Sequence, residues 1–143
     1  MEKNSLASKM AFEYHKSGFH CAESVSNAII EVYGNNISHD IPKVATAFGG
    51  GVGRTKQDIC GGLVGGFIAL GFLYGRSEPG TDWAVASDLA AELRKRFVQK
   101  HGTTNCGTLL EAFGPQENMM LCKQLSGEVA GMLADILEEH KKL

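Results

Sequence analysis

The sequence lacks the short cysteine motifs that are typical of zinc, haem and thioredoxin-type redox sites. No two of its four cysteines form a Cys-x-x-Cys pair. This absence excludes the common local zinc modules, the thioredoxin-type redox motif and covalent haem attachment through Cys-x-x-Cys-His. Any site that the cysteines form must therefore be assembled by folding, from separate segments of the chain.

The chain also lacks an excess of charge of either sign. Its 143 residues include 14 Lys and Arg against 16 Asp and Glu, which gives a formal net charge of -2. Nothing in this balance favours binding to nucleic acid or to an anionic membrane. We therefore expect no nucleic-acid partner, and a partner that is a protein or a small molecule.

Long apolar runs are missing as well. Residues 1–20 contain acidic and basic side chains where a signal peptide would need an apolar segment. The longest uncharged stretch, residues 59–75, is shorter than the roughly 18 apolar residues expected of a membrane-spanning helix. We expect no membrane span and a cytoplasmic location, where thiols, metal ligands or a working redox pair are favoured over permanent disulfides.

What the sequence has instead is helical periodicity, with no Asn-Gly hairpin signal and no clear alternating strand. It predicts an all-α fold: a single domain over residues 1–143, built as a bundle of about five to seven helices around a central, buried, glycine-rich helix. The expected helices cover 5–16, 21–33, a short segment from 42, 60–75, 83–100, 106–113 and a last segment from about 122. A turn is expected at 34–36, in Gly-Asn-Asn.

Glycine is concentrated in two places. The run at 49–53 contains four glycines, which predicts a turn with positive φ or a close backbone approach, and it lacks the Gly-Lys-Ser/Thr ending of a phosphate loop. Within the glycine-rich helix, Gly61 and Gly65, and likewise Gly62 and Gly66, are four residues apart. Such spacing lets another helix come close, and could also support a homodimer.

All four cysteines stand where a helix is expected to begin, and each heads an apolar stripe at helical spacing. They are Cys21, Cys60, Cys106 and Cys122. A helix N-terminus carries free N–H groups and about half a positive charge, so it stabilises the thiolate, which is the nucleophilic and metal-binding form. One such cysteine could be simple packing. Four in the same arrangement indicate one electron-rich site, in which all four are candidate catalytic, cofactor-binding and metal-ligating residues.

Several chemistries remain open for this site. A [2Fe–2S] cluster accepts four thiolates and is the first expectation, with zinc or no metal as alternatives. The cysteines could also work in pairs by thiol–disulfide exchange, which requires paired Cα atoms within about 7 Å. A helical interaction domain without redox chemistry is the remaining alternative.

The polar residues near the cysteines are expected to have structural roles. Consecutive helical residues point about 100° apart, so His20 is predicted to be a surface or capping residue rather than an acid–base partner for Cys21. His101 is expected at a helix end, on the surface. Arg54 and Lys56 are expected to be solvated loop charges.

The pattern resembles the C_GCAxxG_C_C family of small redox-active proteins, over nearly the whole chain. Cys21 matches the first cysteine of that family, Cys106 and Cys122 match the last two, and Cys60-Gly61-Gly62-Leu63-Val64-Gly65 matches its glycine element. Further similar features are Phe48-Gly49-Gly50-Gly51 and Asn105-Cys106. This chain departs from the pattern at Gly62, where the family usually has alanine, and all the cysteines are kept. The resemblance implies an oxidoreductase or electron-transfer protein and names no substrate.

Overall fold

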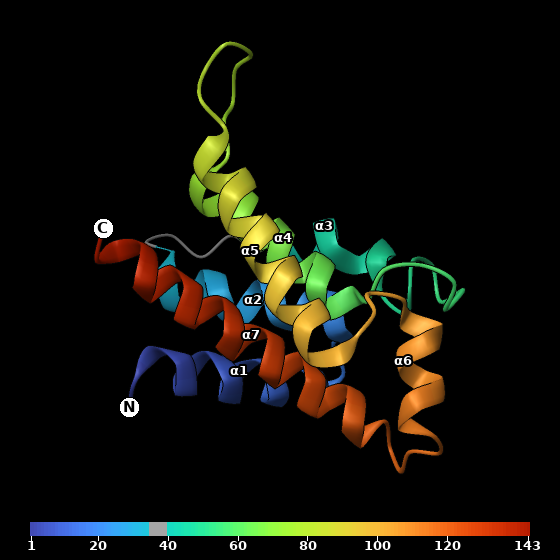
Figure 1. The fold of residues 1–143 in the computed structure, drawn as a ribbon. Helices are drawn as coiled ribbons and strands as arrows, with labels where there is room; N and C mark the ends of the chain where they lie inside the picture. Colours follow the sequence, from blue (N-terminus) through green and yellow to red (C-terminus); the bar gives the residue numbers. More distant parts are fainter. Residues whose placement is uncertain (35–39) are drawn as a thin grey trace.

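The computed structural model describes residues 1–34 and 40–143, and these form a bundle of α-helices (Figure 1). The helices are α1 Lys3–Ser17, α2 Cys21–Tyr33, α3 Ile41–Ala45, α4 Gly61–Tyr74, α5 Ala84–His101, α6 Cys106–Phe113 and α7 Met120–Lys141, with a 3-10 turn, η1, at Thr46–Phe48. In these residues there is no β-strand, only an isolated bridge between Ile59 and Asn105. The predicted all-α bundle is confirmed. The turn expected at 34–36 lies, apart from Gly34, outside the described residues.

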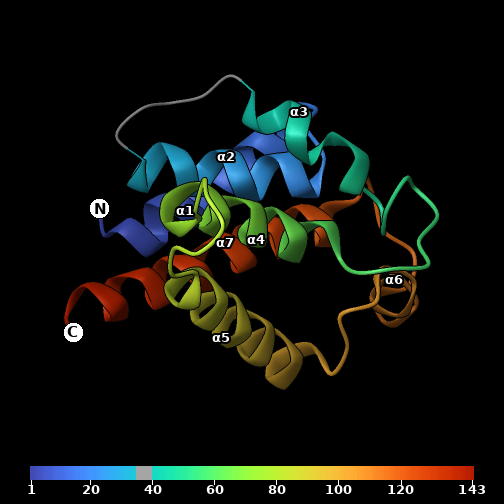
Figure 2. The ribbon, with the colours of Figure 1, turned by 90° about the horizontal axis from the view of Figure 1, so that it is seen from above.

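The longest helix, α7, packs on α1, α2, α4 and α5. It runs beside α1, and both chain termini lie at the end of the bundle opposite α6 (Figures 1 and 2). Small residues allow the α1–α7 contact to be close, because Ala7 and Ala11 are fully buried and a Cβ on Gly127 would lie 2.9 Å from the carbonyl oxygen of Ser8. Large apolar side chains from the other helices, including Ile29, Leu93 and Phe97, complete the core.

The glycine-rich helix predicted at the centre is α4. Its first turns are buried, and a Cβ on Gly65 would lie only 2.4 Å from the carbonyl oxygen of Ala22 in α2. A Cβ on Gly66 would lie 2.6 Å from the Leu93 side chain in α5. The close approach that the glycines permit is therefore made within the chain, while a homodimer stays a prediction. None of the described helices has the length and apolar character that crossing a membrane requires.

The loop between η1 and α4 lies against the segment that precedes α6, and hydrogen bonds join the two. Gly50, Gly51 and Gly53 have positive φ angles of 64°, 69° and 61°, which confirms the turn predicted for the glycine run. At the end of the loop, the Cys60 N–H donates to the Thr104 carbonyl at 2.7 Å, and the Cys106 N–H donates to the Asp58 carbonyl at 2.8 Å. These two hydrogen bonds hold the beginning of α4 beside the beginning of α6, which stands at the edge of the bundle (Figure 1).

Candidate redox site

Each cysteine lies at the start of a helix, as the sequence predicted. Cys21 and Cys106 are the first residues of α2 and α6, Cys60 is the N-cap of α4, and Cys122 lies in the first turn of α7. All four are free thiols. Cys60 is 5% exposed and the other three are half-buried.

The structure brings the four cysteines around one small cavity of about 40 Å³, where these four helices begin. Leu109, Leu110 and Phe113 line the cavity from α6, and Leu125 and Ser126 line it from α7. The space is therefore mostly apolar apart from the sulfur atoms. The apolar face of the short helix α6 therefore packs mainly on this cavity.

Cys21 has the most polar surroundings of the four. Its Sγ packs against Gly61, where a Cβ would lie 2.3 Å from the sulfur. Burial alone would raise the pKa of the Cys21 thiol. Hydrogen bonds from the His20 side chain and from the backbone N–H groups of Gly50 and Ala22 outweigh burial, so the net pKa is lowered. The N-termini of α2 and α4 add to this preference for an anion.

The other three thiols are held neutral. Burial raises the pKa of Cys60 to about 12, and proximity to Cys21 adds to the shift. Burial also raises the pKa values of Cys106 and Cys122, and Cys21 acts on both in the same direction. Ionisation of Cys21 therefore makes ionisation of its neighbours more costly, and the cavity favours one thiolate among three thiols.

His20 caps α2, as predicted, but the prediction that it is no partner for Cys21 is wrong. As the N-cap it has extended backbone angles, φ −88° and ψ −178°, so the 100° rule for consecutive helical residues does not apply to it. The contact with Cys21 raises the pKa of His20, against burial and with help from the Thr46 carbonyl and Glu23. Its Nδ1 atom is buried without a hydrogen-bond partner of regular geometry among the described residues.

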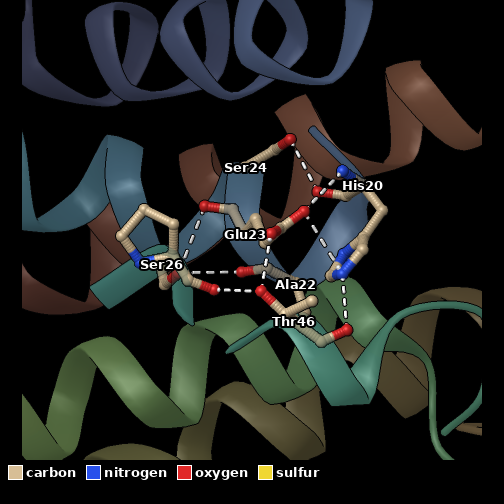
Figure 3. Close-up of polar contacts among 7 residues, drawn as sticks. His20, Ala22, Glu23, Ser24, Ser26 and Thr46 are labelled. Carbon is tan, nitrogen blue, oxygen red and sulfur yellow. Dashed lines mark hydrogen bonds and ion pairs between the residues drawn. The ribbon is translucent and has the colours of Figure 1, made fainter. Parts of the chain in front are cut away.

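The His20 ring is held by polar contacts at its other nitrogen (Figure 3). Nε2 lies 2.8 Å from the Thr46 carbonyl oxygen and 3.2 Å from Oε1 of Glu23. The Thr46 hydroxyl donates to Oε2 of the same carboxylate at 2.8 Å. Gly49 leaves room for the ring, since a Cβ there would lie 2.6 Å from it. Glu23, η1 and the start of the glycine run thus fix the imidazole next to Cys21.

Two further polar contacts at the cavity carry no sequence motif and were not predicted. Gln116 holds Cys122, because its Nε2 donates to Sγ at 3.4 Å and its Oε1 accepts the Cys122 N–H at 3.0 Å. Ser126 is fully buried, and its Oγ lies 2.9 Å from Nδ1 of His15. Burial lowers the pKa of His15 to about 4, so this imidazole is neutral at pH 7.

His101 ends α5 as predicted, but its side chain is only 14% exposed and does not lie on the surface. Its Nε2 lies 2.6 Å from Oε1 of Glu128 rather than against Cys106. Arg54 and Lys56 are exposed loop residues. Lys56 nevertheless acts on the site, because its charge opposes the rise in the pKa of Cys106.

Four thiols are the right donors for a [2Fe–2S] cluster or a zinc ion. Within residues 1–34 and 40–143, however, no group of three or more His, Cys, Asp or Glu side chains is placed to hold a metal ion. The thiols as positioned do not fit a metal, and the predicted iron–sulfur and zinc sites are not confirmed.

Comparison with known proteins places this arrangement in a family. The sequence model described as "Putative redox-active protein (C_GCAxxG_C_C)" matches residues 19–136, a span that contains all four cysteines. This chain belongs to the C_GCAxxG_C_C family. An uncharacterized protein of Archaeoglobus fulgidus is 28% identical to it over 118 residues, which cover 76% of this chain and 77% of that protein. No solved structure matches the chain. The match confirms the resemblance predicted from the cysteine pattern, and the family's description agrees with the predicted class of function.

The buried Cys60 thiol gives this C_GCAxxG_C_C protein an expected sensitivity to alkali. In the unfolded chain the thiol ionises near its usual pKa of about 8.5, whereas in the folded protein it stays protonated until about pH 12. The unfolded state then binds fewer protons, so the free energy of unfolding falls as pH rises above 8.5, by about 2 kcal/mol at pH 10. Urea unfolding from pH 8 to 10 should show this slope, and Cys60→Ala should flatten it. An unchanged slope in the variant would contradict the assignment.

Proposed function

We propose that the protein is a thiol–disulfide redox protein in which Cys21 is the attacking thiolate and Cys60 is its resolving partner. The contrast within one cavity carries the proposal: the pKa of Cys21 is lowered, while the pKa values of the three thiols around it are raised. Thiol–disulfide chemistry needs such a thiolate beside a protonated thiol. The couple interconverts two thiols with one disulfide, two protons and two electrons, and the electrons pass to a partner disulfide, which is reduced to two thiols.

Cys60 is the best-supported partner because it and Cys21 meet at the same point of α4. The Cys21 sulfur packs against Gly61, the residue that follows Cys60 in the chain. Cys60 is 5% exposed, and proximity to Cys21 adds to the rise in its pKa that burial causes. Cys106 of α6 and Cys122 of α7 also line the cavity, and proximity to Cys122 adds to the rise in the pKa of Cys106 that burial causes. We assign these two cysteines to exchange with an external thiol.

His20 is the proton acceptor for Cys21 in this proposal. Nε2 is already engaged by Thr46 and Glu23, which leaves the buried Nδ1 for the thiol proton. Transfer of that proton creates a thiolate–imidazolium pair, in which each charge stabilises the other. Because Glu23 faces the imidazolium, the pair has a compensating carboxylate on its outer side.

The experiment that tests the proposal is an anaerobic redox titration of the full chain. Protein is equilibrated in buffers of oxidised and reduced dithiothreitol, quenched by alkylation and mapped by mass spectrometry, with iron, sulfide and zinc measured in the same sample. We expect two thiols per chain to be lost together, as a Cys21–Cys60 disulfide. A protein that keeps four thiols at every potential would overturn the proposal.

The metal analysis decides the alternative raised by the sequence. The sequence predicted an iron–sulfur centre because such a cluster accepts four thiolates, although no group among the described residues is placed to hold a metal ion. Iron and sulfide bound at stoichiometric amounts, with visible absorption that disappears on chelation, would replace the disulfide proposal by that centre. Zinc in a colourless protein would indicate a structural site instead.

A further inference from the structure

The cavity restricts the size of any molecule that can reach Cys21. Its volume is about 40 Å³, well below the roughly 150 Å³ of an apolar cavity that holds benzene. Gly61 packs against the Cys21 sulfur, and side chains of α6 also line the cavity. There is room for a molecule of a few heavy atoms. A peptide disulfide, or a tripeptide thiol joined through a disulfide, carries far more atoms than this space admits.

The groups around the Cys21 sulfur suit one class of small oxidant. A hydroperoxide presents two oxygen atoms, of which one is attacked by a thiolate and the other leaves with a developing negative charge. The N–H groups of Gly50 and Ala22 point to the sulfur, where they can stabilise the charge as it moves onto oxygen. The adjacent His20 imidazolium is a proton donor for the leaving oxygen.

We propose that the cavity is a peroxide-reducing site in which Cys21 reacts with hydrogen peroxide in preference to larger hydroperoxides. This inference rests on the Cys21–Cys60 couple proposed above and adds the substrate class. The small cavity is not needed for a dithiol couple as such, whereas a two-oxygen substrate fits it. His20, which accepts the Cys21 proton in that couple, takes a second role here as the proton donor to the leaving oxygen.

The reaction balances in two steps. The Cys21 thiolate attacks one oxygen of the peroxide, so that an S–O bond forms, the O–O bond breaks, and the departing hydroxide takes a proton from His20 and leaves as water. Cys21 is then a sulfenic acid, oxidised by two electrons. The Cys60 thiol attacks the Cys21 sulfur, an S–S bond forms and the S–O bond breaks. The hydroxyl group leaves as a second water with the Cys60 proton, and an external dithiol restores both thiols.

The test compares single-turnover rates of the fully reduced protein. We expect hydrogen peroxide to oxidise the folded protein on the order of 100-fold faster than the urea-unfolded chain at the same pH, since preorganised donors contribute about that factor. Cumene hydroperoxide, whose aromatic group exceeds the cavity, should react at least about tenfold more slowly than hydrogen peroxide. In Cys60→Ser the reaction should stop at Cys21 sulfenic acid, which dimedone traps and mass spectrometry locates.

A second variant tests the size limit directly. Phe113→Ala enlarges the cavity from the α6 side, so the rate with cumene hydroperoxide should rise relative to the rate with hydrogen peroxide in the same variant. The exposed Gly71, which has nothing within 4 Å of an added Cβ, provides the control Gly71→Ala, in which both rates should equal those of the wild type. The peroxide inference alone would be overturned if hydrogen peroxide oxidised the folded and the unfolded protein at the same rate while the dithiothreitol titration still showed the Cys21–Cys60 couple. Absence of the couple would overturn both proposals.

Discussion

Ultraviolet titration of the reduced protein is expected to show one thiol that ionises below the usual cysteine pKa of about 8.5, and Cys21→Ser is expected to remove this step completely. The reason is that Cys21, although buried, receives hydrogen bonds from His20 and from two backbone N–H groups. Thiolate absorption reports this ionisation without a reagent that must enter the cavity. The matched control is Cys122→Ser, in which the step should be kept because the pKa of Cys122 is raised.

His20→Gln tests, in the same titration, how much the imidazole contributes to the lowered pKa of Cys21. Without the imidazole, burial of the Cys21 thiol is opposed only by the backbone donors, so the midpoint of the step should move to higher pH. At pH 7 the thiolate fraction falls, and the rate of any reaction that depends on the thiolate falls with it. If the low-pH ionisation step persisted in Cys21→Ser, or if its midpoint did not move in His20→Gln, a group other than the Cys21–His20 pair would cause that step.

The second large effect is expected at Gly65, where α4 packs closely against the backbone of α2. A methyl group there would lie 2.4 Å from the carbonyl oxygen of Ala22, a backbone atom that cannot move without moving α2. Gly65→Ala should therefore lower the free energy of unfolding by about 1–3 kcal/mol, the usual cost of overpacking. Urea unfolding monitored by circular dichroism measures this change.

The control for Gly65→Ala lies in the same helix. Gly71→Ala introduces the same methyl group into open space, and alanine is the better helix former by up to about 1 kcal/mol. The free energy of unfolding should therefore stay equal or rise. Similar losses of stability in both variants would contradict the packing of α2 against α4 described above.

Much of the fold follows from local patterns that the sequence shows directly. Apolar spacing and turn residues predict the helices, since a helix buries one face and ends at residues such as Gly102 and Gly114, which here have positive φ. Asn105 caps α6, accepting the Thr108 N–H through its side chain. The same local logic places each cysteine at a helix start.

The details of the site depend on contacts that no local pattern encodes. His15 and Ser126 meet across 111 residues of sequence, and Thr46 reaches Glu23 across 23. The role of His20 depends on extended backbone angles at a single residue just before α2 begins. The size of the cavity depends on where α6 rests, which the hydrogen bonds of the preceding loop determine. These are tertiary effects, so the sequence could indicate the four cysteines but not which of them ionises.

The four cysteines come from four separate helices, and this makes their chemistry a reporter of the native state. In the folded chain one thiol is acidic and three are not, whereas in an unfolded chain all four revert to ordinary, equivalent thiols. The spread of the four ionisation constants thus measures how much of the bundle is assembled. Heat, denaturant or a packing defect at α4 should therefore reduce that spread in a titration of the purified protein, with no label added.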